Sequence, residues 1–140
     1  MIEQLDRRTI LQVVAGALLL PSTAPAAEIQ DAVLSKQDGR LEAQPFGDLR
    51  VFLQGQTGTL TSLTFGSLEL KAAQSPHAPH RHPEEEIMLI TEGQGEISLE
   101  GRVTKVAPGS IMYAASNRLH GIVNTSDALL TFYYFKWLGK

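Results

Sequence analysis

The stretch His80-Arg81-His82-Pro83-Glu84-Glu85-Glu86-Ile87-Met88-Leu89-Ile90-Thr91-Glu92-Gly93 decides the fold of this chain. His80 and His82 are two residues apart, a spacing that puts both side chains on one face of an extended strand. Glu86 follows after an even interval, so its carboxylate can return to that face. Two imidazoles and a carboxylate form an N,N,O site that suits Mn, Fe, Co, Ni, Cu or Zn, and the ligands alone do not choose among these metals. A further nitrogen would have to come from far along the chain, and His120 is the candidate.

Short alternating runs of apolar and polar residues continue on both sides of this stretch, and each ends at Gly, Pro or Asn. Gly66-Ser67 and Gly93-Gln94-Gly95 are expected to be turns, the second closing a hairpin. A short helical turn is expected at 29–35. Strands at this spacing indicate an all-β sandwich or barrel. The expected strands are 49–53, 59–65, 68–72, 87–91, 96–99, 103–106, 110–114, 121–123 and 129–137.

Composition narrows the class of protein. The chain has 140 residues, which is the size of one domain. Hydrophobic residues make up 43% and charged residues 19%, enough apolar material for a packed core. The formal net charge of −3 gives no basic surface for nucleic acid and no polybasic patch for an anionic membrane. The absence of cysteine excludes disulfides, thiolate zinc sites, iron–sulfur ligation and a cysteine nucleophile, so any metal is held by nitrogen and oxygen.

Residues 1–27 differ from the rest and predict a cleaved export signal. Arg7-Arg8 precedes an apolar run at 10–20 that is too short to span a bilayer, and small residues follow up to Ala27. The arginine pair resembles a twin-arginine signal, although Asp6, Ile10 and Gln12 depart from its consensus and leave general secretion open. An amphipathic helix that packs on the domain is the other interpretation. We expect an exported protein, periplasmic or extracellular, that meets the export machinery through residues 1–27 and has no stable membrane insertion.

The stretch at 80–93 resembles the first cupin motif, which is Gly, five residues, His-x-His, three or four residues, Glu, six residues and Gly. Every spacing from His80 to Gly93 fits, and Gln74 replaces the leading glycine. The second motif is Gly, five residues, Pro-x-Gly, two residues, His, three residues and Asn. Its fixed positions correspond here to Gly109, Ala115, Asn117, His120 and Asn124, with Ala115 in place of proline and Asn117 in place of glycine. Asn tolerates the left-handed conformation that glycine would adopt there.

The resemblance covers roughly residues 45–137 and implies a small double-stranded β-helix, the jelly-roll barrel of the cupins. It also implies one divalent transition metal inside the barrel. The implied ligands are His80, His82, Glu86 and His120. Iron or manganese is the most common metal in the family, with nickel, zinc, cobalt and copper as alternatives. The expected organisation is a signal at 1–27, an N-terminal arm at 28–44 and the barrel at 45–140.

Other polar and aromatic residues receive structural interpretations. His77 lies among prolines at an odd interval from His80, so we expect it to be exposed or at the mouth of the pocket. Asn124 is expected to be a turn or hydrogen-bonding residue rather than a ligand. Glu84 and Glu85 are expected to be charges at the rim. The aromatic run at 132–137 should alternate, with half in the core and half outside, where it could contact a second copy in a homodimer.

Two functions fit this pattern. The first is a metal-dependent enzyme that acts on a small molecule outside the cytoplasm, as an oxygenase, isomerase or decarboxylase. The second is a non-catalytic module that binds a metal or a small ligand. The sequence indicates no Lys, His or second carboxylate in register with the ligand set that would serve as general acid or base. Fold alone does not choose between these functions.

Overall fold

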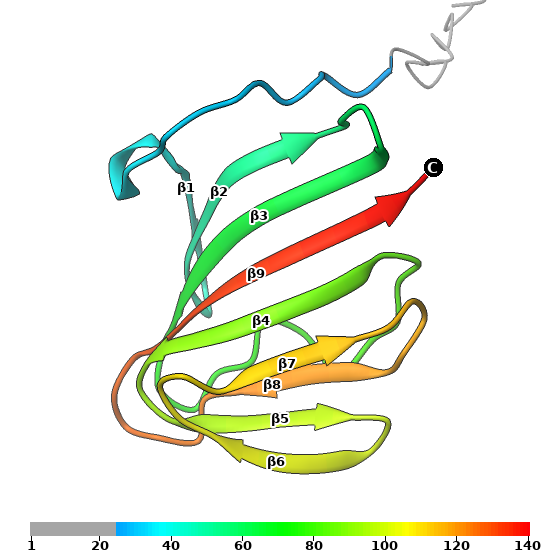
Figure 1. The fold of residues 1–140 in the computed structure, drawn as a ribbon. Helices are drawn as coiled ribbons and strands as arrows, with labels where there is room; N and C mark the ends of the chain where they lie inside the picture. Colours follow the sequence, from blue (N-terminus) through cyan, green and yellow to red (C-terminus); the bar gives the residue numbers. More distant parts are fainter. Residues whose placement is uncertain (1–24) are drawn as a thin grey trace, which may run out of the picture.

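The computed structural model describes residues 25–140, and these residues form two antiparallel sheets with almost no helix (Figure 1). The larger sheet has the strand order β1-β2-β3-β9-β4-β7, and the smaller has the order β6-β5-β8. Most strands therefore pair with strands distant in the sequence, which is the arrangement of a jelly-roll barrel. The strands are β1 (Arg40–Gln44), β2 (Gly47–Gly55), β3 (Leu60–Leu70), β4 (Glu85–Glu92), β5 (Gly95–Leu99), β6 (Arg102–Val106), β7 (Ile111–Ala114), β8 (His120–Val123) and β9 (Leu130–Gly139).

The hydrophobic core lies between the two sheets and takes its buried residues from β3 to β9, at alternate positions where a strand supplies two. In β4, Glu86, Met88 and Ile90 are buried while the residues between them are partly exposed. This alternation follows from strand geometry, in which successive side chains point to opposite faces. Glu86 is thus a charged residue on the core side of its strand. The apolar core consists of Leu68, Leu70, Met88, Ile90, Ile97, Val106, Met112, Ala114, Ile122, Leu130 and Phe132.

The aromatic run of β9 alternates as predicted. Phe132 is buried in the core, whereas Tyr133 and Phe135 lie on the outer face of the larger sheet. There their rings stack on Phe65 of β3, with centroid distances of 5.8 Å to Tyr133 and 4.3 Å to Phe135. The outer face therefore carries a partly exposed aromatic cluster that plays no part in the core.

The turn predicted at Gly66-Ser67 is wrong, because both residues lie inside the continuous strand β3. Gly66 pairs with Val51 on one side and with Tyr134 on the other. A Cβ added at Gly66 would overlap the hydroxyl of Tyr134. Glycine at this position therefore makes room for the phenol of Tyr134 and does not end the strand.

The hairpin predicted at Gly93-Gln94-Gly95 is also wrong. β4 and β5 do not pair with each other, since β4 belongs to the larger sheet and β5 to the smaller one. Gly93 has a positive φ of 79°, and a Cβ there would overlap the carbonyl oxygen of Leu129. The glycine is required because the chain turns a corner between sheets while touching another backbone segment.

The helical turn predicted at 29–35 is wrong. A short 3₁₀ helix, η1 (Lys36–Asp38), begins after Ser35 instead. The backbone N–H and the hydroxyl of Ser35 donate to the carboxylate of Asp38 at 2.6 and 2.7 Å. These two bonds place the start of the helix later than the sequence pattern indicates.

The start of the described chain runs beside the end of β2. The backbone N–H of Ile29 donates to the carbonyl of Gln56 at 2.9 Å, and the N–H of Gln56 donates to the carbonyl of Ala27 at 3.0 Å. These backbone bonds hold the segment extended rather than helical. The export signal predicted at 1–27 lies almost entirely outside the described residues, so it stays a prediction.

Candidate metal centre

The four residues of the predicted ligand set come from three parts of the chain. His80 and His82 lie in the loop between β3 and β4, Glu86 lies on β4, and His120 begins β8. The loop is held against β8 by a backbone bridge. The N–H of His80 donates to the carbonyl of His120 at 2.9 Å, and the N–H of His120 donates back at 3.0 Å. The main chain therefore places these two distant residues side by side.

Residues on either side of the bridge tie the same loop down. Asn117 donates its backbone N–H to the carbonyl of His82 at 2.8 Å. The Arg81 guanidinium donates to the carbonyl of Asn117 at 2.8 Å and to the carboxylate of Glu100 at 3.1 Å. Asn117 has a φ of 60°, so it adopts the left-handed conformation expected for it. These contacts fix the position of the loop without using any of the predicted ligand side chains.

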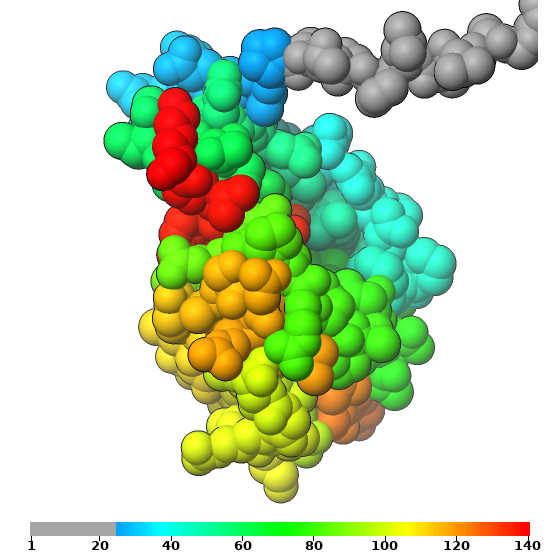
Figure 2. Space-filling view, turned by 90° about the vertical axis from the view of Figure 1, so that its right-hand side faces the viewer, coloured from blue at the N-terminus to red at the C-terminus, as the bar shows by residue number. Residues whose placement is uncertain are grey.

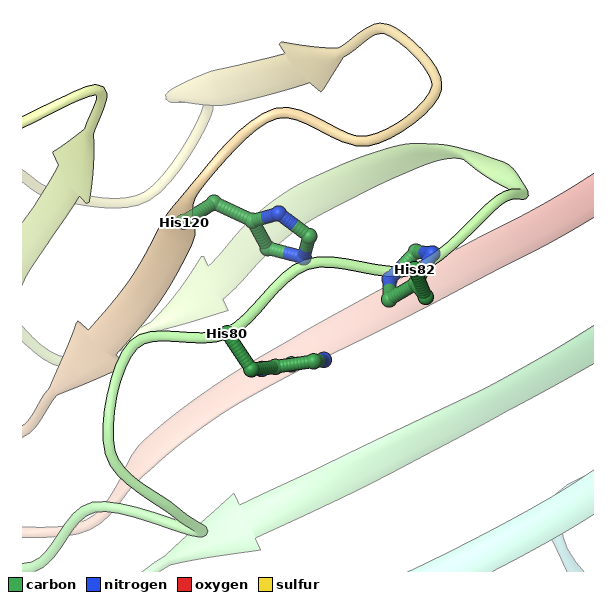
Figure 3. A group of neighbouring side chains, drawn as sticks. All are labelled: His80, His82 and His120. Carbon is green, nitrogen blue, oxygen red and sulfur yellow. The ribbon is translucent and has the colours of Figure 1, made fainter.

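Three imidazoles converge in one place (Figure 3). One nitrogen of each of His80, His82 and His120 lies within 4.8 Å of the corresponding nitrogens of the other two, so the three could hold a metal ion. Glu86 faces the same point. One of its carboxylate oxygens, Oε2, lies 2.8 Å from Nε2 of His82 and 3.0 Å from Nε2 of His120. Glu86 and His120 are 4% and 2% exposed, so both are shielded from bulk water.

The donor set fits a divalent transition metal. Nδ1 of His120 lies 2.8 Å from the carbonyl of Arg118, and Nδ1 of His82 lies 3.1 Å from the carbonyl of Glu84. A backbone carbonyl on Nδ1 leaves Nε2 to point at the ion, which is the usual outer contact of a metal-binding histidine. His80 adds an independent sign, because its Nδ1 is buried without a hydrogen-bond partner among the described residues. Buried polar atoms without partners are rare.

The pKa values of Glu86, His120 and His80 differ from the ordinary values in ways that suit a bound cation. Burial raises the pKa of the Glu86 carboxyl, but hydrogen bonds from His120 and His82 outweigh burial and hold that pKa below its ordinary value. The hydrogen bond to Glu86 raises the pKa of His120. Burial, followed by the neighbouring imidazoles, lowers the pKa of His80 to about 4. At neutral pH the site therefore offers a charged carboxylate and a neutral His80, and a metal would displace protons from its partners.

A cavity of about 190 Å³ opens onto His80 and Glu86. Most of its wall is apolar. Small-molecule sites are concave and mostly apolar, with a few polar groups that orient the ligand. This cavity has that character. Its lining residues are Phe46, Leu49, Leu68, Pro76, His77, His80, Glu86, Met88, Phe132, Tyr134 and Lys136.

Two polar residues of the cavity, Tyr134 and Lys136, were not predicted. Lys136 pairs with Glu86 across β9 and β4, so a lysine does lie in register with the ligand set. The sequence contained a signal for it, because the alternation of β9 puts Phe132, Tyr134 and Lys136 on one face. What the sequence did not supply was the pairing of β9 with β4.

His77 and Asn124 lie where the sequence predicted them. His77 is exposed and lines the cavity, and its ring meets that of His80 edge-on with centroids 3.9 Å apart. Asn124 is fully buried. Its amide donates to the carbonyls of Leu70 at 3.0 Å and Ala128 at 2.7 Å, so its role is to hold two loops together.

The acidic neighbours of Glu86 have separate positions. Glu85 lies on the outer face, where its carboxylate accepts hydrogen bonds from the hydroxyl of Tyr113 at 2.6 Å and from the indole N–H of Trp137 at 2.8 Å. It does not line the cavity, so its prediction as a rim charge is wrong. Glu84 lies beside the centre, with a carboxylate oxygen 3.3 Å from Nδ1 of His82.

Residues 67–135 match the family model for the cupin domain. The matched segment, 69 of the 140 residues, is just under half of the chain. The match spans β3 to β9 and includes the bridge, the three histidines and Glu86. No curated protein matches the chain. No helix in residues 25–140 is long and apolar enough to cross a membrane.

Solved structures share the fold of this chain at low sequence identity. An RmlC-like cupin from Shewanella frigidimarina aligns with a TM-score of 0.65 and 12% identity, covering 79% of this chain and 94% of the other. A predicted oxalate decarboxylase from Thermotoga maritima aligns with a TM-score of 0.63 and 20% identity, covering 76% and 99%. The polyketide cyclase RemF from Streptomyces resistomycificus aligns with a TM-score of 0.61 and 17% identity, covering 77% and 80%.

Proposed function

We propose that this cupin is a metal-dependent enzyme that acts on a small molecule. His80, His82, Glu86 and His120 would hold one divalent transition metal, with iron or manganese as the first candidates and nickel, zinc, cobalt or copper as alternatives. The observation that carries the proposal is the convergence of three imidazoles and a buried carboxylate at the wall of an apolar cavity. A purely structural metal would need no such cavity beside it.

Different residues of the site bind the substrate and orient the metal ligands. When bound, the metal supplies a Lewis acid that polarises an oxygen of the substrate. The apolar wall of the cavity, with Leu68, Met88 and Phe132, excludes water and packs the rest of the substrate. The backbone carbonyls at Nδ1 of His82 and His120 hold the imidazole rings in place. The reaction class would be oxygenation with dissolved O₂ as the oxidant, isomerisation or decarboxylation.

The test is reconstitution followed by a substrate panel. The full chain is loaded separately with Fe(II), Mn(II), Ni(II) or Zn(II), and turnover of diketones, phenolic acids, sugars and oxalate is measured. We expect turnover with one substrate class and one or two metals, and its loss in Glu86→Gln. Tight metal binding without turnover across the panel would instead favour the non-catalytic binding module. An absence of metal binding would refute the metal-dependent enzyme and leave only a module that binds a small ligand.

We also propose that the protein works outside the cytoplasm, in the periplasm or extracellular space. The support is the order of Arg7-Arg8, the apolar run at 10–20 and the small residues up to Ala27. Cleavage after Ala27 would leave Glu28 as the first residue, next to its bridge partner Gln56. N-terminal sequencing of the mature protein from each cell fraction tests this proposal.

A homodimer through the outer face of the larger sheet is the partner arrangement that we propose. The outer face exposes large apolar side chains, with Ile111, Tyr113 and Phe135 at 68%, 51% and 37% exposure. Contiguous apolar patches of this kind mark protein contacts. Light scattering of wild type and Phe135→Lys tests it, and a monomeric wild type would refute it.

A further inference from the structure

Two hydrogen-bond donors of β9, Tyr134 and Lys136, line the cavity. Tyr134 pairs with Met88 and Lys136 with Glu86, so both side chains lie on the core side of the sheet beside the candidate centre. Within residues 25–140, the ammonium of Lys136 has no carboxylate within 4.0 Å, and the hydroxyl of Tyr134 makes no hydrogen bond. Both groups line the cavity and are free to meet a ligand.

The charge balance of the cavity favours an anion. Glu86 is the carboxylate that lines it, and His82 and His120 already share its Oε2 atom. Lys136 lies close enough to His120 for its charge to lower the pKa of that imidazole. A dication bound beside Lys136 would leave the cavity with an excess of positive charge, because Glu86 supplies one negative charge. Uncompensated charge in a poorly hydrated site is unfavourable, and an anionic ligand relieves it.

Tyr134 is suited to donate rather than accept. Burial, followed by the charges of Glu42 and Glu86, raises the pKa of Tyr134 to about 12. The phenol therefore keeps its proton at neutral pH and presents it to the cavity. Gly66 leaves room for the phenol, since any side chain at that position would overlap the hydroxyl.

We propose that Tyr134 and Lys136 form an anion subsite, and that the substrate is a small, mostly apolar organic acid. One oxygen of its acidic group accepts hydrogen bonds from the two β9 side chains, while the apolar part lies against Leu68, Met88 and Phe132. The cavity of about 190 Å³ has room for a ligand that carries one ring or a short chain. This inference rests on the proposed function in taking the same cavity as the substrate site.

The test compares benzoate with benzamide, two probes of similar shape that differ in charge. Calorimetry measures their binding to the full chain, both metal-free and loaded with Zn(II). We expect benzoate to bind more tightly than benzamide in both forms. Lys136→Met should weaken benzoate about tenfold or more, the usual effect of losing a charge-assisted hydrogen bond, and leave benzamide unchanged. Tyr134→Phe should weaken benzoate to a smaller extent.

Two further variants control for folding and for general charge. Lys136→Arg keeps the positive charge and should retain a preference for benzoate. Lys105→Met removes an exposed lysine of β6 and should leave the binding of both probes as in wild type. Equal binding of the two probes, no effect of Lys136→Met, or no benzoate binding at millimolar concentration would overturn the subsite.

The outcomes separate this inference from the proposed function. If no metal binds but metal-free protein still prefers benzoate through Lys136, the metal centre fails and the subsite stands. If Zn(II) binds at the histidines while Lys136→Met leaves the affinity for benzoate unchanged, the subsite fails and the metal centre stands.

Discussion

Removing one imidazole from the candidate centre should abolish most of the stability that a metal gives this fold. A ligand that binds only the native state stabilises it by RT ln(1 + [L]/Kd), which is about 2.7 kcal/mol at a hundredfold excess over Kd. For a domain near this size, 1 kcal/mol corresponds to about 4 °C in Tm. EDTA should therefore lower the wild-type midpoint by about 10 °C. The metal-free protein should stay folded at room temperature, because the apolar core remains when the metal is removed.

The informative variant is His120→Ala. His120 is 2% exposed, and its ring contacts the Arg118 carbonyl and Glu86, so the variant loses stability with or without metal. The quantity to compare is the difference in Tm between the metal-loaded and metal-free forms of the same variant, because the loss of stability is common to both forms. If binding weakens about a hundredfold, the gain at the same metal concentration falls to about 0.4 kcal/mol, or about 2 °C.

The assay is a thermal melt of each reconstituted protein with and without EDTA, together with metal content by mass spectrometry. His77→Ala should keep both the metal and the shift, since His77 is exposed and touches only the ring of His80 within the centre. Glu85→Ala should lower the midpoint by removing the acceptor of Tyr113 and Trp137, yet keep the shift. A wild type with neither bound metal nor an EDTA-sensitive midpoint would refute the reasoning.

Three other outcomes are expected. In metal-free protein, absorbance titration should show one phenol ionising near pH 12, and Tyr134→Phe should remove that step. Because the phenol of the unfolded chain ionises near pH 10, the free energy of unfolding should fall as the pH rises from about 10 to 12. A highest ionisation step near pH 10 would contradict the argument. Asn124→Ala should cost about 2–4 kcal/mol in urea unfolding, since it strands buried carbonyls, and a loss under about 0.5 kcal/mol would show that water replaces the amide. Arg7→Lys with Arg8→Lys should keep the precursor in the cytoplasm, whereas undiminished export would indicate general secretion.

The predictable part of the site was the part encoded by spacing. The interval between His80 and His82 and the even offset to Glu86 describe a single face of extended chain, and the structure brings these residues together with His120. Ligation of a metal by these four residues remains a prediction. The left-handed Asn117 was predictable as well, since few other residues accept that conformation.

The unpredictable part depended on which strands pair. Gly66 looked like a turn because its neighbour in space, Tyr134, is far away in the sequence. Gly93 looked like a hairpin because the change of sheet after β4 leaves no trace in local composition. Lys136 was missed for the same reason, since its place beside Glu86 follows from the β4–β9 register alone. Local patterns predict strands, whereas long-range register decides which side chains meet.

The backbone bridge between His80 and His120 has a consequence for how such a centre can change over generations. Because the two chain segments are joined through amide and carbonyl groups, the geometry of the frame does not depend on which side chains stand at these positions. Mutation can therefore exchange one imidazole for another donor, and so alter which metal or chemistry the protein supports, while the scaffold survives the intermediate steps. The same property makes positions 80 and 120 suitable starting points for engineering a new catalyst into this barrel.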